Sequence, residues 1–310
     1  MLNKEDLKGL WVSVPTEWDE DGSFDERVFR DEVAKLVEAG PHGLYTTGST
    51  GEYYAMDYAE WKRVQDAFLA ETRGKLPVQV GANWFNTQGT IERVRYAQSI
   101  GADAVQICFP AWMEMRQEDY DQFLIDVCEA VPDISVIHYN IARTKKLFFA
   151  DDYARVLPHT PSLIGTKAAV PFDQLVKLFV EVPELNHFVG ELYFPLAHQL
   201  GCRGMYTSWF MMNPSFIKAY YTLCTEGNYA EAISIMKRLA KWHRAAVEPL
   251  VRQGYWDPTL DKAFVEMTGW LPGNRRTRKP HHPLTDDGVK ELRRITEEIV
   301  PEFLAYRDRP

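Results

Sequence analysis

The stretch LIGTKAA, Leu163–Ala169, is an apolar strand candidate that ends on a lysine instead of a turn. Small residues follow Lys167, so its ammonium would lie at a strand end in a confined place and not on a solvated helix face. Desolvation disfavours the charged form of lysine and can lower its pKa by several units, which frees the amine to attack a ketone. Lys167 is therefore our candidate nucleophile, and a Schiff base would be its product. Most of the chain's 35 lysines and arginines should be solvated, so the argument depends on the residues that accompany Lys167.

Apolar segments that could be strands recur along the chain at intervals that suit one strand and one helix each. Amphipathic stretches lie between them, for example at Tyr58–Thr72 and Gln117–Ala130, which indicates repeated βα units. An open doubly wound sheet uses the same alternation, and the positions of the motifs described below favour a barrel. The eight strand candidates are residues 10–14, 43–47, 78–81, 104–109, 135–139, 163–167, 187–190 and 205–208.

We predict an α/β fold, a (β/α)8 TIM barrel over residues 1–214 with a C-terminal helical extension over residues 215–310. The strand signals stop after Asn213 and Pro214, and the rest of the chain is helical in pattern. No flexible linker separates the two parts, so we expect the extension to pack on the barrel as one structural unit.

Composition and charge exclude several classes of function. A formal charge of −9 argues against nucleic-acid binding, and no apolar run approaches the roughly 20 residues of a membrane span. The N-terminus lacks an apolar signal core, so we expect a cytoplasmic protein. We interpret one basic run, residues 274–282, as a solvated loop or a subunit contact. Neither disulfides nor a zinc site is expected from the four well-separated cysteines Cys108, Cys128, Cys202 and Cys224.

Two further motifs follow strand candidates. The loop TTGSTGE, residues 46–52, offers backbone amides and the hydroxyls of Ser49 and Thr50 to a small carboxylate, although ordinary βα turns share this composition. The fifth strand candidate ends on Tyr139 and Asn140. A tyrosine there could relay protons, or it could be a packed aromatic with a satisfied hydroxyl. His138 should point away from Tyr139 on a strand, so we interpret it as structural.

Together, the loop ending at Glu52, the strand ending at Tyr139 and the Gly-Thr-Lys sequence ending at Lys167 resemble the dihydrodipicolinate synthase and N-acetylneuraminate lyase superfamily. The likeness runs from Gly9 to Pro214. It implies a TIM barrel with a C-terminal helical extension, usually a homotetramer, that forms a Schiff base with pyruvate or another 2-oxo acid. It implies no metal and no organic cofactor. The expected partners are small molecules, a 2-oxo acid and an aldehyde.

The resemblance also implies roles for individual residues. Lys167 would form the Schiff base, Tyr139 would shuttle protons, and the Thr50 hydroxyl would contact the tyrosine, which makes these three the catalytic candidates. Arg143 would bind a distal carboxylate, or it is a solvated loop arginine. The candidate substrate-binding residues are Ser49, Thr50, Gly51, Trp112, Asn140, Arg143, Gly190 and Ser208.

One departure from the synthases bears on the substrate. Residues 110–112 read Pro-Ala-Trp where dihydrodipicolinate synthases have two tyrosines after the proline, and this resembles the hydratase-aldolase branch. We therefore expect a lyase or aldolase that reversibly cleaves or forms a carbon–carbon bond, with an aryl or apolar substrate. The alternatives are a dihydrodipicolinate synthase-like condensation, a sugar-acid dehydratase, and a non-catalytic sensor barrel that binds a 2-oxo acid. Five aromatic residues expected at the barrel rim favour the first reading: Trp84, Phe85, Trp112, Trp209 and Phe210.

Overall fold

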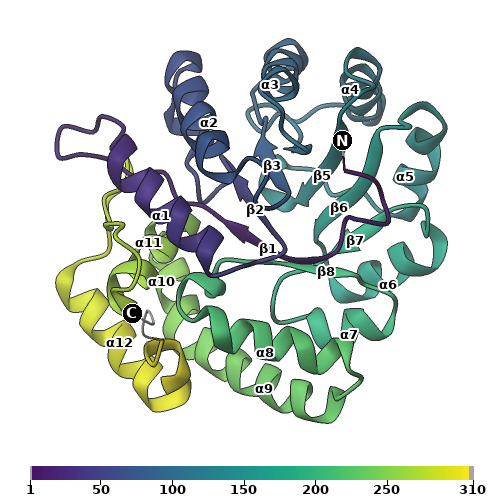
Figure 1. The fold of residues 1–310 in the computed structure, drawn as a ribbon. Coiled ribbons are helices and arrows are strands. Elements are labelled where there is room, and N and C mark those ends of the chain that lie inside the picture. Colours follow the sequence, from purple (N-terminus) through teal and green to yellow (C-terminus); the bar gives the residue numbers. More distant parts are fainter. Residues whose placement is uncertain (1, 307–310) are drawn as a thin grey trace.

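The computed structural model of the chain describes residues 2–306 (Figure 1). Its eight parallel strands follow the order β7-β6-β5-β4-β3-β2-β1-β8, and a parallel bridge from Val189 to Met205 brings the two ends together. The sheet is thus a nearly closed barrel, which confirms the predicted TIM barrel. Each predicted strand agrees with an observed one to within two residues at either end. The strands are β1 (Gly9–Ser13), β2 (Gly43–Thr46), β3 (Val78–Gly81), β4 (Ala104–Ile107), β5 (Ser135–Ile141), β6 (Leu163–Ala169), β7 (Asn186–Phe188) and β8 (Gly204–Thr207).

Helices α1–α8 surround the barrel, and α9–α12 belong to the extension (Figure 1). Local sequence sets their starts: Asp57 and Glu60 form a capping box at α2, and Asn86 caps α3. The predicted boundary at residue 214 assigned α8 to the extension, whereas α8 follows β8 as the helix of the eighth βα unit. The helices are α1 (Glu26–Glu38), α2 (Tyr58–Thr72), α3 (Thr87–Ser99), α4 (Gln117–Ala130), α5 (Ala150–Val156), α6 (Phe172–Glu181), α7 (Phe194–Gln199), α8 (Pro214–Thr225), α9 (Tyr229–Trp242), α10 (Glu248–Arg252), α11 (Asp257–Thr268) and α12 (Asp286–Ile299). Within residues 2–306, no helix is long and apolar enough to cross a membrane.

Side chains fill the interior of the barrel and close one of its ends. Leu2 and Leu7 belong to the interior cluster, and Leu2 bonds through its backbone to Asp103 and Ser135, which precede or begin β4 and β5. The N-terminal segment therefore covers the end where the strands start. The opposite end, where the strands finish, is left for a site, as is usual in this fold. The other members of the interior cluster are Trp11, Tyr45, Ala104, Ile137, Phe188 and Tyr206.

Buried charges tie the C-terminal extension to the barrel. Lys262 of α11 is 0% exposed, and its Nζ lies 2.9 Å from Oε1 of Glu52, which follows β2. The other Glu52 oxygen accepts a hydrogen bond from the backbone N–H of Arg278, and a Glu17 carboxylate oxygen accepts one from the N–H of Asn274. The basic run 274–282 is therefore a partly exposed loop that is anchored on the barrel by its backbone, and its role as a subunit contact stays a prediction.

Candidate active site

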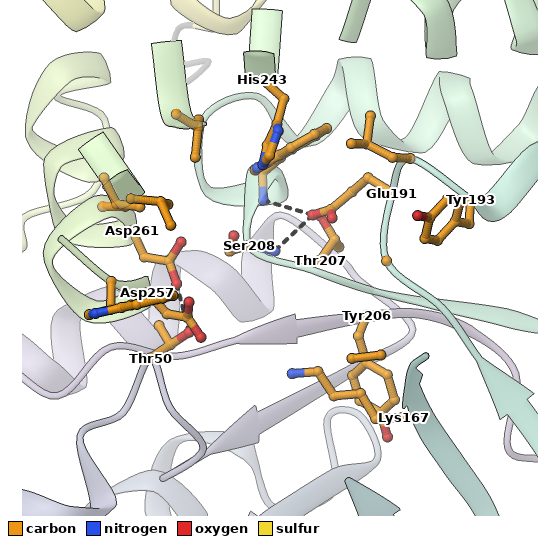
Figure 2. Close-up of a pocket in the computed structure, with 18 of the residues that line it drawn as sticks. Thr50, Lys167, Glu191, Tyr193, Tyr206, Thr207, Ser208, His243, Asp257 and Asp261 are labelled. Carbon is orange, nitrogen blue, oxygen red and sulfur yellow. Dashed lines mark hydrogen bonds between the residues drawn. The ribbon is translucent and has the colours of Figure 1, made fainter. Parts of the chain in front are cut away.

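Lys167 extends from β6 at the open end of the barrel, where it meets three tyrosine side chains. Its Nζ donates a hydrogen bond of 3.0 Å to the Tyr45 hydroxyl and lies 4.2 Å from the centre of the Tyr139 ring. Tyr139 pairs with Lys167 across the neighbouring strands β5 and β6, so the two side chains share one face of the sheet. The Tyr206 ring centre lies 5.2 Å from the same nitrogen (Figure 2). The structure brings Lys167 and Tyr139 together, as expected, and adds Tyr45, which sequence reasoning missed.

Burial changes the ionisation of Lys167. Desolvation lowers the pKa of Lys167 from 10.5 to about 8, and the nearby Arg143 charge acts in the same direction. Three carboxylates limit this decrease, because negative charge nearby favours the ammonium. They are Asp257, Asp261 and Glu191. At pH 7 roughly a tenth of the protein then carries a neutral amine, which is far more than an ordinary lysine would.

The hydroxyls of the loop after β2 divide between two partners. Burial raises the pKa of Tyr139, so this phenol holds its proton at neutral pH, and Ser49 hydrogen-bonds to it. Thr50 instead donates a hydrogen bond of 2.6 Å from Oγ1 to Oδ2 of Asp261. The expected contact between Thr50 and Tyr139 was therefore wrong: Ser49 makes it, because Thr50 is turned toward α11.

Helix α11 brings two carboxylates to the site, and the sequence analysis missed both. Asp257 forms a two-pronged ion pair with Arg143, with both N–O distances 2.7 Å. Asp261, one turn later, accepts hydrogen bonds from Thr50 and Ser208. Burial, then the neighbouring Asp257, raises the pKa of Asp261 to about 7, so this group can exchange a proton near neutral pH. The spacing of four residues on one helix face was the sequence signal that could have found them.

Glu191 supplies a third carboxylate from the loop after β7. Its Oε1 accepts hydrogen bonds from the backbone N–H groups of Ser208, at 3.1 Å, and Trp209, at 3.3 Å (Figure 2). Burial raises the pKa of Glu191, and the hydrogen bonds from Thr207 and the backbone oppose this effect. Glu191 is thereby fixed on one side of the cavity, while Asp257 and Asp261 lie with Thr50 on another (Figure 2).

A cavity of about 540 Å³ lies above Lys167 between the barrel and the extension. The predicted residues Thr50, Arg143, Gly190 and Ser208 line it together with Lys167. Much of its remaining wall is apolar and includes Leu192, Tyr193, Trp209, Val247, Val251, Trp256, Leu260 and Phe264. A second cavity, of about 260 Å³, is lined by Ser49 and Tyr139 and shares Arg143 and Trp256 with the first.

Four of the predicted substrate-binding residues do not line the main cavity, and one of them, Ser49, lines the second cavity instead. The amide of Asn140 is buried and exchanges two hydrogen bonds with the backbone of Phe148, so it holds the following loop. Gly51 packs against the backbone of Thr47, where a Cβ would come within 2.6 Å of its nitrogen. Trp112 is 77% exposed and lies in a surface hollow with Phe85, Pro110, Met113 and Met115.

Of the five aromatic residues predicted at the barrel rim, one lines the main cavity. Trp209 lines the cavity, whereas Phe210 is fully buried in the core. Trp84 lies against Arg93, whose guanidinium is 3.6 Å from the indole centre. The apolar wall comes mostly from α10, α11 and the loop after β7, which sequence spacing could not bring to the site. In the described part of the chain, no group of three or more His, Cys, Asp or Glu is placed to hold a metal ion.

Comparison with known proteins agrees with this architecture. A model of the dihydrodipicolinate synthetase family matches residues 6–299. The chain belongs to this family. Like other members of the dihydrodipicolinate synthetase family, it is an enzyme of the class I aldolase and lyase type. The 4-hydroxy-tetrahydrodipicolinate synthase of Methanopyrus kandleri is 28% identical over 300 residues, which cover 95% of this chain and 94% of that protein.

Two solved structures share the fold of this family member. PhdJ bound to a substrate intermediate matches with a TM-score of 0.86 and 18% identity, and 99% of each chain is covered. YagE from E. coli K12 in complex with pyruvate matches with a TM-score of 0.85 and 20% identity, covering 94% of this chain and 98% of that one. At these identities the likeness establishes a common fold, extension included.

Proposed function

We propose that this protein is a Schiff-base lyase or aldolase in which Lys167 forms an imine with pyruvate or another 2-oxo acid. The observation that carries the proposal is the Lys167 amine, which has a lowered pKa and lies 4.2 Å from the centre of the Tyr139 ring. The loop with Ser49 and Thr50 lies beside both residues and would hold the carboxylate of the 2-oxo acid.

The chemistry follows from the imine. The neutral amine adds to the keto carbon, water leaves, and the protonated imine withdraws electrons from the adjacent carbon. Loss of a proton, or cleavage of the carbon–carbon bond at that position, then gives an enamine, and the reverse step forms the bond. Tyr139 would move the protons because it is a neutral phenol within reach. These steps require neither a metal nor an organic cofactor.

For the second half of the substrate, we propose an apolar or aryl aldehyde, released after hydration of a double bond as in a hydratase-aldolase.

 The apolar wall formed by Tyr193, Trp209, Trp256 and Phe264 supports this choice. A hydroxylated 2-oxo acid is the second candidate, because Glu191 and Asp261 could accept hydrogen bonds from its hydroxyl groups. The homotetramer implied by the family resemblance stays a prediction, and the exposed hollow around Trp112 would suit a contact between copies.

Trapping with borohydride tests the imine directly. Incubation of the protein with pyruvate and sodium borohydride should add one reduced three-carbon adduct, located on Lys167 by peptide mass spectrometry. Omission of pyruvate is the control. A mass that stays unmodified at millimolar pyruvate would contradict the proposed function.

The rate of trapping should depend on pH with the profile of a buried amine. Imine formation needs the neutral form of Lys167, and its pKa is about 8. Below pH 8 the initial rate should therefore rise by about tenfold per pH unit, and it should level off by roughly pH 9. A quenched time course between pH 6 and 10 measures this. A rate that keeps rising past pH 10 would indicate an ordinary solvated lysine.

A further inference from the structure

Arg143 is the one cationic side chain besides Lys167 that lines the main cavity, among the residues described. It follows β5, and its two terminal nitrogens lie 2.7 Å from the two carboxylate oxygens of Asp257. The Trp256 ring lies 4.9 Å from the guanidinium carbon. A two-pronged, charge-assisted pair of this kind uses the face of the guanidinium that would otherwise bind a planar anion.

The other charges around the cavity do not favour a second anion. His243 lines the cavity, and burial lowers its pKa, so it is neutral at pH 7. Lys167 is consumed by the imine. Glu191 and Asp261 also line the cavity, and when either is ionised its negative charge disfavours the binding of an anionic substrate tail.

We propose that Asp257 determines substrate specificity: by pairing with Arg143, it closes the cavity to 2-oxo acids and aldol adducts whose distal end carries a carboxylate. The favoured distal group is neutral. This inference rests on the proposed Schiff-base function and replaces the expectation that Arg143 binds a distal carboxylate.

Competition explains why a substrate carboxylate does not displace Asp257. Asp257 is held next to Arg143 by its helix, so its effective concentration is high and independent of substrate. Displacement of Asp257 would also break this two-pronged, charge-assisted ion pair, and the Asp257 side chain, 32% exposed, would regain only part of its contact with water. A substrate anion must overcome both terms, whereas a neutral tail faces neither.

Matched 2-oxo acids test the inference without knowledge of the natural aldehyde. The six-carbon pair is 2-oxohexanoate and 2-oxoadipate, and the five-carbon pair is 2-oxopentanoate and 2-oxoglutarate. Within each pair the acids differ in a terminal methyl or carboxylate group. The readout is the concentration that gives half-maximal borohydride trapping, relative to that of pyruvate for the same variant. The wild-type protein should require at least about tenfold more of the anionic member.

The variant Asp257→Ala should abolish this preference because it frees Arg143. We expect trapping by 2-oxoadipate to improve at least about tenfold relative to 2-oxohexanoate. The double variant Asp257→Ala with Arg143→Gln should lose that gain. Asp121→Ala is the matched control, because Asp121 also pairs with an arginine, Arg155, on the outside of the barrel. It should leave the ratio unchanged.

The outcomes separate this inference from the function beneath it. If pyruvate is not trapped by the wild-type protein, the proposed function fails. If pyruvate is trapped and the wild-type protein prefers the dicarboxylates, Arg143 is open to substrate and only the inference about Asp257 fails. An unchanged ratio in Asp257→Ala, when that variant still traps pyruvate, overturns it too. The wild-type comparison decides the question alone if the variant does not fold.

Discussion

Lys167→Met should form no borohydride-stable adduct with pyruvate and should lose turnover by at least about a thousandfold. Methionine fills a similar volume but has no amine, so the covalent step is removed while the packing against Tyr45 and Tyr139 is largely kept. Intact mass after trapping, together with turnover of whichever substrate the wild-type protein accepts, measures the effect. Lys177→Met, on the exposed side of α6, is the control and should behave as the wild type.

The same variant separates an enzyme from a sensor. A protein that only binds a 2-oxo acid would show no adduct in the wild type and would keep its affinity for pyruvate after Lys167→Met. The proposed lyase should instead lose the adduct that the wild type forms. Isothermal calorimetry with pyruvate on both proteins distinguishes the two results.

Lys262→Met should lower the free energy of unfolding by about 3–5 kcal/mol at pH 8. Lys262 is 0% exposed and pairs with Glu52 at 2.9 Å. Its charge also acts on Glu17 and Glu32, which are fully buried. Removal of the lysine leaves this carboxyl cluster without its cation, because no other lysine or arginine side chain bonds to these three groups in the described residues. Urea or guanidinium unfolding measures the change.

The loss caused by Lys262→Met should be smaller at pH 5 than at pH 8. Burial raises the pKa of Glu17 and of Glu32, so in the folded protein they bind protons that the unfolded chain has released. Stability from these groups therefore falls as the pH rises above the unfolded value and grows on acidification. Lys290→Met, an exposed lysine on α12, should change stability by less than about 0.5 kcal/mol at either pH. An equal loss at both pH values would show that charge is not the cause.

The barrel could be predicted because its signals are local. Each strand is a short apolar run bounded by turn residues, and the intervening helices carry their own caps, so one sequence contains the whole repeat. The position of Lys167 beside Tyr139 was implied by the family resemblance, and the structure pairs the two residues across the neighbouring parallel strands β5 and β6. His138 was correctly expected to point away, and it bonds to Tyr153 behind the sheet.

The rest of the site depends on contacts between distant parts of the chain. The spacing of Asp257 and Asp261 places them on one helix face, but they lie more than 100 residues from Arg143 and Thr50, and nothing in the sequence shows that these residues are their partners. Trp112 was assigned to the pocket because it follows a strand, but the direction of a loop cannot be read from its length. Both errors have one origin. The local sequence determines the position of a residue along a strand, whereas the side of the cavity formed by the extension depends on tertiary packing.

Two consecutive residues of helix α11 point in different directions: Asp261 points toward the cavity, and Lys262 points toward the buried carboxyl cluster. Exchange of this C-terminal segment with that of a relative would therefore change two properties at once. It would alter substrate selectivity through the cavity residues and stability through the ion pair of Lys262. In a folded and active chimaera, the barrel must therefore contain acidic residues that pair with Lys262. It must also contain an arginine that pairs with Asp257. Shortening the protein to the barrel alone would remove the part of the cavity wall that the extension supplies, and it would also remove Lys262 from the buried carboxyl cluster.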